Sequence, residues 1–210
     1  MKFGLPSIDL QYDWVSLLNE YKKHVTKKST VLEIGASTVE RTRQLSPYCK
    51  KIIGVEYFAK RVPKNFDNVT YVKADWQYLT KVIKKKSIDI AISNQVIEHV
   101  DKDVQALNEL YEVLKPGGIA LISTPNRTRL LQKLSDVIAG KERTFPWAEH
   151  VREYTSEDVT QLIKKTRFKK FKIKPLVFGL HAGPFYAYFE SAPKSFQKYV
   201  NFLEFHLFKK

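Results

Sequence analysis

The stretch Val31-Leu32-Glu33-Ile34-Gly35-Ala36-Ser37 is a short apolar run with one acid, and it ends at a glycine. Apolar runs of this length that stop at glycine are typical of buried parallel strands, and the small residues that follow let a ligand approach the backbone. The stretch therefore predicts a nucleotide-type pocket. By itself the prediction is weak, because the same order of strand, glycine and helix begins many α/β proteins that bind nothing there.

Four further strand-like runs follow at regular spacing. They cover Lys51–Glu56, Val69–Asp75, Ser87–Asn94 and Ile119–Ser123. Helix-like segments separate them, and this alternation predicts right-handed crossovers and a mainly parallel sheet with helices on both faces. Residues 168–176 and 186–189 are expected to form a final antiparallel pair. The predicted fold is α/β and Rossmann-like, with seven mostly parallel strands and an antiparallel last strand.

Composition limits the classes of protein to consider. A length of 210 residues with 43% hydrophobic residues fits one domain with a substantial core. The single cysteine, Cys49, excludes an internal disulfide framework, which favours a reducing, cytoplasmic location. We find no signal-like N-terminus and no apolar run long enough to span a bilayer, although peripheral membrane contact remains an alternative.

The chain is basic, with 36 Lys+Arg against 22 Asp+Glu and a net charge of +14. Such a charge can attract nucleic acid, anionic lipid or an acidic substrate. The lysines are scattered in pairs and triplets, such as Lys84-Lys85-Lys86. A solvated surface explains this pattern at least as well as a binding face does.

Within the single domain 1–210 we expect four parts. These are an N-terminal capping helix in 1–28, a cofactor-binding core in 29–124, a lid in 125–154, and a C-terminal part in 155–210. The lid is expected because the strand–helix rhythm breaks after Pro125, at the sheet edge where open α/β folds bind ligands. The C-terminal part should contain a helix capped at Thr155, the antiparallel strands and an aromatic, basic tail, which we expect to form a helix docked on its own domain.

A series of motifs resembles the class I S-adenosylmethionine-dependent methyltransferases. The motifs are VLEIGAS, GVEYF, VKADW, IDIAISNQVIEHV, LKPGG, ISTPNR and HVREYTSEDVTQLI. The resemblance covers roughly residues 29 to 168 and is nearest to the branch of ubiquinone-biosynthesis O-methyltransferases and related small-molecule enzymes. Several ordered motifs are far more specific than any one of them.

The resemblance implies a set of cofactor-binding residues. Glu33 lies where the family places an acid near the cationic methionine end of S-adenosylmethionine, and Gly35 would leave room for the cofactor because it has no Cβ. Ala36 and Ser37 complete this loop. Asn94 lies where the family borders the methionine moiety.

The same resemblance assigns the other half of the cofactor. Glu56 stands where the family's acid accepts hydrogen bonds from both ribose hydroxyls, with Tyr57 beside it. Asp75 occupies the place that accepts from the adenine amino group, and Trp76 could pack on the ring. For each acid alone a helix cap or a solvated loop is the better interpretation. Together, at successive strand ends, they favour a pocket.

The chain departs from the family in its first loop. The family's Gly-x-Gly-x-Gly has Ser37 and Val39 at its second and third glycines here. Val39 is β-branched and must have ordinary helical angles. The departure puts cofactor affinity in doubt and leaves a non-catalytic interaction protein as an alternative.

Methyl transfer from a sulfonium needs alignment and exclusion of water, and it needs a base only if the acceptor arrives protonated. His150, in the expected lid, is our first candidate for that base, because a histidine accepts protons near neutral pH. Glu98 and His99 follow, and Glu153 and His181 are further candidates. Some quinone-pathway relatives hold a metal with Glu-x-x-Glu-His at this place. Gln95 replaces the first acid here, so we predict no metal, although weak binding by Glu98 and His99 remains an alternative.

These observations predict a methyltransferase that uses S-adenosylmethionine to methylate an O or N atom of a small, hydrophobic acceptor, as a monomer or homodimer. An RNA methyltransferase is an alternative suggested by the net charge, although no appended RNA-binding module is evident. A dinucleotide-dependent oxidoreductase fits less well, because the first loop lacks the glycines that it requires.

Overall fold

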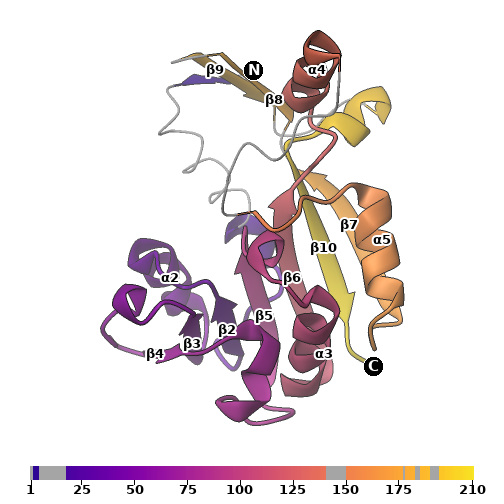
Figure 1. Ribbon diagram of the computed structural model, residues 1–210. Coiled ribbons are helices and arrows are strands. Elements are labelled where there is room, and N and C mark those ends of the chain that lie inside the picture. Colours follow the sequence, from indigo (N-terminus) through magenta and orange to yellow (C-terminus); the bar gives the residue numbers. More distant parts are fainter. Residues whose placement is uncertain (1, 5–17, 141–149, 177, 183–184, 190–193) are drawn as a thin grey trace.

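The structure is a computed structural model that describes residues 2–4, 18–140, 150–176, 178–182, 185–189 and 194–210. Its centre is a seven-stranded sheet with the strand order β4-β3-β2-β5-β6-β10-β7 (Figure 1). The strands are β2 (Thr30–Ile34), β3 (Lys51–Glu56), β4 (Val69–Lys73), β5 (Ile88–Asn94), β6 (Leu114–Pro125), β7 (Lys170–Leu176) and β10 (Phe202–Phe208). Strands β2 to β6 pair in parallel, and β10 runs antiparallel to both of its neighbours. The predicted seven-stranded, mostly parallel sheet is confirmed.

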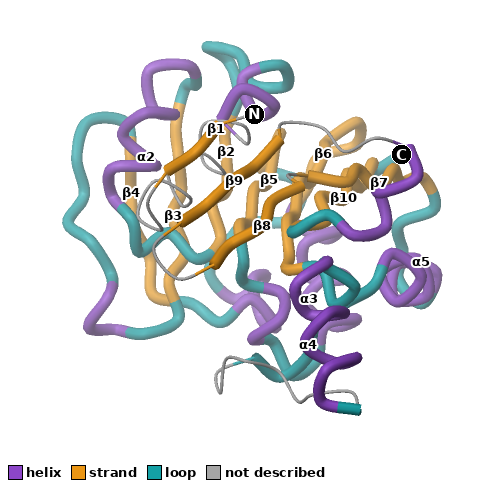
Figure 2. Tube along the Cα trace, turned by 90° about the horizontal axis from the view of Figure 1, so that it is seen from above, coloured by secondary structure: helices purple, strands orange, loops and turns teal. Residues whose placement is uncertain are grey.

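Helices cover both faces of this sheet (Figure 2). They are α2 (Val39–Leu45), α3 (Asp103–Val113) and α5 (Ser156–Lys164), and residues 18–22 are also helical. A further helix, α4 (Leu130–Ala139), lies beyond the end of the sheet (Figure 1). One apolar cluster packs α3 and α5 against the sheet, and a second packs Leu18, Tyr21 and α2 against the other face. Short 3-10 helices fill the connections: η1 (Ser46–Tyr48), η2 (Ala59–Arg61), η3 (Trp76–Lys81), η4 (Ile97–His99) and η5 (Lys194–Tyr199). Burial on two faces explains why the parallel strands are almost wholly apolar.

The helix boundaries follow local chemistry. α5 begins at a capping box, in which the Thr155 side chain accepts from the Asp158 amide and Asp158 accepts from the Thr155 amide. α4 ends at Gly140, which has a φ of 64°. α3 ends at Val113, three residues before Pro116. All three helices were predicted from these signals.

Two predictions for the C-terminal part were wrong. Strand β7 pairs with β10 and not with residues 186–189, and the tail is the strand β10 and not a helix. Leu203, Phe205 and Leu207 point to one face and pack in the cluster of α3 and α5. Glu204 and His206 alternate with them and are also buried. This period of two is that of a strand, and the surrounding aromatic residues concealed it.

A second, three-stranded sheet has the order β1-β9-β8, formed by β1 (Lys2–Gly4), β8 (Phe178–Ala182) and β9 (Phe185–Phe189). β9 pairs antiparallel with both neighbours. This small sheet and α4 lie beyond the carboxyl end of the parallel strands (Figure 1). The expected lid, residues 125–154, includes α4. Residues 141–149 of this lid, with Pro146 and Trp147, lie outside the described residues. The lid therefore stays a prediction, as does most of the N-terminal helix.

Within the described residues, no helix combines the length and the apolar character needed to cross a membrane.

Candidate active site

A pocket lies at the carboxyl ends of β2 and β5. The described residues that line it are Tyr21, Glu33, Ile34, Gly35, Thr38, Arg41, Ile92 and Asn94. β2 pairs with β3 on one side and with β5 on the other, so the order of strands reverses here. Ligands of open α/β sheets bind in the crevice at such a reversal. The topology thus brings together three predicted cofactor residues, Glu33, Gly35 and Asn94.

Gly35 is required by its backbone and by a neighbouring side chain. Its φ is +78°, and a Cβ on it would lie 2.4 Å from Cγ2 of Val96. Its amide donates to the Val55 carbonyl at 2.9 Å. We predicted that the missing Cβ leaves room for the cofactor. The structure adds a second reason for glycine here, the close approach of Val96, and the predicted role of Gly35 toward the cofactor stays a prediction.

Glu33 is a buried acid at the end of β2. It is 7% exposed, and its Oε2 accepts a hydrogen bond of 2.7 Å from Thr42 Oγ1. Burial raises the pKa of Glu33 to about 7, although the Thr42 hydrogen bond and the charge of Arg41 both act to lower it. A cation in the pocket would restore the charged form of this carboxylate.

The end of β5 is held by β6. Ser123 Oγ donates to Asn94 Oδ1 at 2.6 Å and accepts from Gln95 Nε2 at 3.3 Å. Gln95 has a φ of +55°, which a residue with a side chain rarely adopts. Such strained positions concentrate at functional sites. No sequence motif predicted this strained backbone at Gln95.

The other predicted cofactor residues lie outside the lining of this pocket. Glu56 is 6% exposed and accepts from the Phe58 amide at 3.0 Å, and Asp75 caps η3 by accepting from the Gln77 amide at 2.8 Å. Trp76 is 3% exposed and belongs to the core cluster of α3. The three remaining residues differ in exposure: Ala36 is buried, whereas Ser37 and Tyr57 are exposed. The roles assigned to these residues remain predictions.

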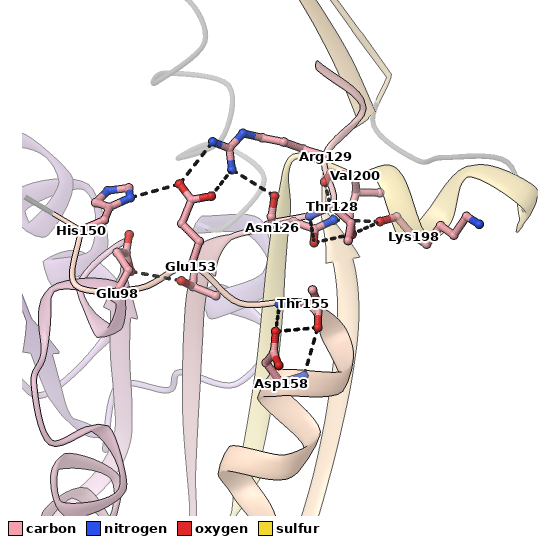
Figure 3. Close-up of polar contacts among 11 residues, drawn as sticks. Glu98, Asn126, Thr128, Arg129, His150, Glu153, Thr155, Asp158, Lys198 and Val200 are labelled. Carbon is pink, nitrogen blue, oxygen red and sulfur yellow. Dashed lines mark hydrogen bonds and ion pairs between the residues drawn. The ribbon is translucent and has the colours of Figure 1, made fainter. Parts of the chain in front are cut away.

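A second group of polar residues joins β6, α4 and the segment before α5 (Figure 3). His150 Nδ1 lies 3.2 Å from Glu153 Oε1. Arg129 holds the same carboxylate with two nitrogens, at 2.7 and 3.2 Å. Both side chains of the His150–Glu153 pair are largely buried. Glu153 thus fixes the orientation of His150, and Arg129 fixes Glu153.

His150 is tuned to be neutral. Burial lowers its pKa, as do the charges of His99 and Arg129, while Glu153 acts in the opposite direction. Because Nδ1 faces the Glu153 carboxylate, we assign the proton of the neutral ring to Nδ1. Nε2 is then the nitrogen that can take a proton from a substrate. A neutral, oriented imidazole can act as a general base.

Glu98 and His99 complete this group. The centroids of the His99 and His150 rings are 4.8 Å apart, and the rings meet edge-to-face. A carboxylate oxygen of Glu98 and one ring nitrogen of each histidine all lie within 4.8 Å of one another. Glu98 is wholly buried, and its Oε1 has no hydrogen-bond partner among the described residues. Burial raises its pKa to about 8, against the hydrogen bond from Thr124. Such a group could hold a divalent metal, so the predicted absence of one remains to be tested.

Several residues of these sites were not predicted from the sequence. Tyr21, Thr38 and Arg41 line the pocket; we expected the N-terminal capping helix that contains Tyr21 to cover the cleft, but Tyr21 was not predicted as a site residue. Arg129 gave no signal, because its partner is 24 residues away. Glu153 was a candidate, and the structure places it beside His150. His181 lies on β8, where side chains are outside the described part.

Comparisons with known proteins agree with this geometry. A family described as Methyltransferase domain matches residues 8–172. A probable S-adenosylmethionine-dependent methyltransferase of Mycolicibacterium smegmatis is 27% identical over 66% of this chain and 51% of its own length. A ubiquinone biosynthesis O-methyltransferase of Rickettsia prowazekii is 30% identical over 56% of this chain and 46% of its own. The chain thus spans about half the length of these curated relatives.

Solved structures show the same fold. A SAM-dependent methyltransferase, possible histamine N-methyltransferase, of Thermotoga maritima superimposes with a TM-score of 0.64, at 24% identity over 94% of this chain and 89% of that one. A SAM-dependent methyltransferase of Archaeoglobus fulgidus superimposes with a TM-score of 0.65, at 17% identity over 93% of each chain.

Proposed function

Because the chain belongs to the methyltransferase-domain family, we propose that it transfers a methyl group from S-adenosylmethionine to an O or N atom of a small, hydrophobic acceptor. The observation that carries the proposal is the convergence of Glu33, Gly35 and Asn94 on one pocket at the reversal of strand order. The relatives' names, which include an O-methyltransferase, support the same class of reaction.

The pocket residues suit the methionine end of the cofactor. When bound, S-adenosylmethionine supplies a methyl group on a positively charged sulfur. In this proposal Glu33 attracts the cationic end of the ligand, since its buried carboxyl group lines the pocket and its hydrogen bond is to the neutral Thr42 hydroxyl. Asn94 is held by Ser123 and borders the ligand. Tyr21 covers the pocket and excludes water.

The second group supplies the base. His150 accepts the proton of a hydroxyl or protonated amine through Nε2, while Glu153 and Arg129 keep the ring in place. Its lowered pKa keeps the ring neutral at physiological pH. The burial of Glu98 beside this base favours an acceptor with little charge.

The donor site is tested by calorimetric titration with S-adenosylmethionine. We expect wild-type binding, and affinity reduced about tenfold or more in Glu33→Gln, because a charge-assisted contact is worth roughly 1.5–3 kcal/mol. Affinity of the wild type should rise with pH up to about 7, as Glu33 ionises, and this rise should be absent in Glu33→Gln. The matched control is Glu40→Gln, the same chemical change on the exposed first turn of α2. Absence of wild-type binding, or equal loss in both variants, would argue against the donor site.

The acceptor is found by incubating the protein with methyl-labelled donor and fractionated cell extract, with small molecules and RNA separated. With an acceptor in hand, His150→Gln should lower kcat by about 10²–10⁴, the usual contribution of a general base, and leave donor affinity unchanged. Label recovered in RNA would favour the nucleic-acid alternative. Loss of activity in chelator with wild-type donor binding would favour a metal at Glu98, His99 and His150.

A further inference from the structure

A second cluster of side chains of metal-binding types lies between residues 20–24 and β10, and none of its members lines the pocket. Glu20 and His24 are four residues apart, and Glu204 and His206 are two apart on β10. We propose that these four side chains form a binding site for a divalent metal ion, with zinc as the preferred ion. The site would join the N-terminal segment to the C-terminal strand.

The distances suit one ion. Glu20 Oε1 lies 3.4 Å from His24 Nε2 and 4.0 Å from His206 Nε2, and the three ligand atoms all lie within 4.8 Å of one another. Ligands bound to zinc at about 2.0–2.1 Å in a tetrahedron are about 3.3 Å apart. Small side-chain rotations would therefore close the site. Glu204 Oε1 contacts His206 Nε2 at 2.5 Å, and the proposal takes it as the fourth ligand.

Burial adds an independent observation. The Glu204 side chain is wholly buried, and its Oε2 has no hydrogen-bond partner among the described residues. A buried carboxylate oxygen without a partner is costly, and a cation would satisfy it. His206 is 3% exposed, whereas His24 is 28% exposed. An ion can therefore reach the cluster from the side of His24.

The ammonium group of Lys174 contacts one of the oxygens that would bind the ion. Lys174, on β7, contacts Glu20 Oε1, and Lys23 contacts the other carboxylate oxygen at 2.8 Å. The carboxylates of Glu20 and Glu204 thus attract cations to this point, and the ammonium group of Lys174 is one such cation. Its side chain is 26% exposed and can turn toward solvent. We expect Lys174 and the metal to compete.

The ligand types select the ion. Two imidazoles and two carboxylates suit zinc, whereas magnesium and calcium prefer oxygen ligands alone. The cluster is separate from the group of Glu98, His99 and His150. Glu20 precedes Tyr21, which lines the pocket. A bound ion would thus fix Tyr21 over the donor site, a consequence that rests on the proposed function.

The test is a titration of chelator-treated protein with Zn²⁺, and with Co²⁺ as a visible spectroscopic probe, in the absence of S-adenosylmethionine. The background carries His99→Ala and His150→Ala, so that the other group cannot contribute. We expect one ion per chain, the intense absorption of tetrahedral Co²⁺, and little response to Mg²⁺. Hydrogen exchange of residues 18–25 should slow when Zn²⁺ is added.

Variants decide whether these residues hold the ion. His24→Ala, at a partly exposed position, and His206→Gln should each weaken Zn²⁺ binding at least about tenfold, as expected for a lost ligand. Lys174→Met should strengthen binding, and Lys170→Met, an exposed position on the same strand, should not. The proposal is overturned if the background protein binds no Zn²⁺, or if His24→Ala and His206→Gln bind as it does. Because the donor is absent, failure here leaves the proposed methyl transfer untouched.

Discussion

At the scale of single residues, the loop after β2 departs from its family without backbone strain. The described non-glycine residues with positive φ are Asp67, Lys86 and Gln95, so neither Ser37 nor Val39 needs the conformation that favours glycine. Val39 begins α2, as its β-branched side chain led us to predict. The loss of two glycines is therefore no sign of a damaged loop. Gly35 is the position that cannot change.

Gly35→Ala should destabilise the protein by about 1–3 kcal/mol more than Gly117→Ala, measured by urea unfolding. Both glycines have a φ of +78°, but a Cβ meets Val96 at Gly35 and nothing within 4 Å at Gly117. The shared backbone cost cancels, and the difference reports overpacking against Val96. Val96→Ala added to Gly35→Ala should recover part of the loss. Equal costs in the two single variants would contradict the close contact.

Glu98 should make stability depend on pH. Its pKa is about 8 in the folded protein against an ordinary value of 4.5, so the folded state binds more protons than the unfolded state between these values. The free energy of unfolding must then fall as pH rises from about 4.5 to about 8. Glu98→Gln removes this loss, because the amide is never charged.

We expect Glu98→Gln to be the more stable protein above pH 8, by on the order of 3–5 kcal/mol at most, and to match the wild type near pH 4. Thermal unfolding in chelator across this range would show it. Parallel pH profiles for the two proteins would contradict the raised pKa.

At the scale of elements, β10 is the strand that completes the core. It lies between β6 and β7 and packs Phe205 into the apolar cluster of α3 and α5. Phe205→Ala should cost about 3–5 kcal/mol, the usual range for a buried phenylalanine. Phe202→Ala, on the same strand but only partly buried, should cost clearly less. Chemical denaturation would measure both, and similar costs would mean that residues 202–208 do not form a central strand.

At the scale of the whole molecule, the two candidate sites share one edge of the sheet. The donor pocket forms where β2 and β5 end, and the group of His150 forms where Glu98, after β5, meets residues 150–153. The Val151 amide donates to the Glu98 carbonyl at 2.9 Å, which joins these segments. The small sheet of β1, β8 and β9 lies beyond the same edge (Figure 1). The proposed methyl transfer therefore has its donor and its acceptor at the same edge of the sheet.

How much of this could be predicted depends on how local each feature is. The parallel strands, α3, α5 and the ends at Gly140 and Thr155 were predicted, because apolar period, caps and glycine act within a few residues. β10 was missed, because its partners are about 30 and 80 residues earlier in the chain. Its mixed aromatic and polar pattern fits a helix until those partners are known.

The candidate sites also combine features that the local sequence predicts with contacts that only the folded chain makes. The sequence by itself determined the alternation of strands and helices, and with it that Glu33, Glu56 and Asp75 would lie at or near the ends of successive strands, since right-handed crossovers leave few other arrangements. Of these three acids, Glu33 lines the pocket, whereas Glu56 and Asp75 lie outside its lining. Only the tertiary structure decided that Tyr21 and Arg41 line the pocket, that Arg129 holds Glu153, and that Glu20 lies near His206. These contacts join segments far apart in the chain, and packing, which no local pattern encodes, sets them.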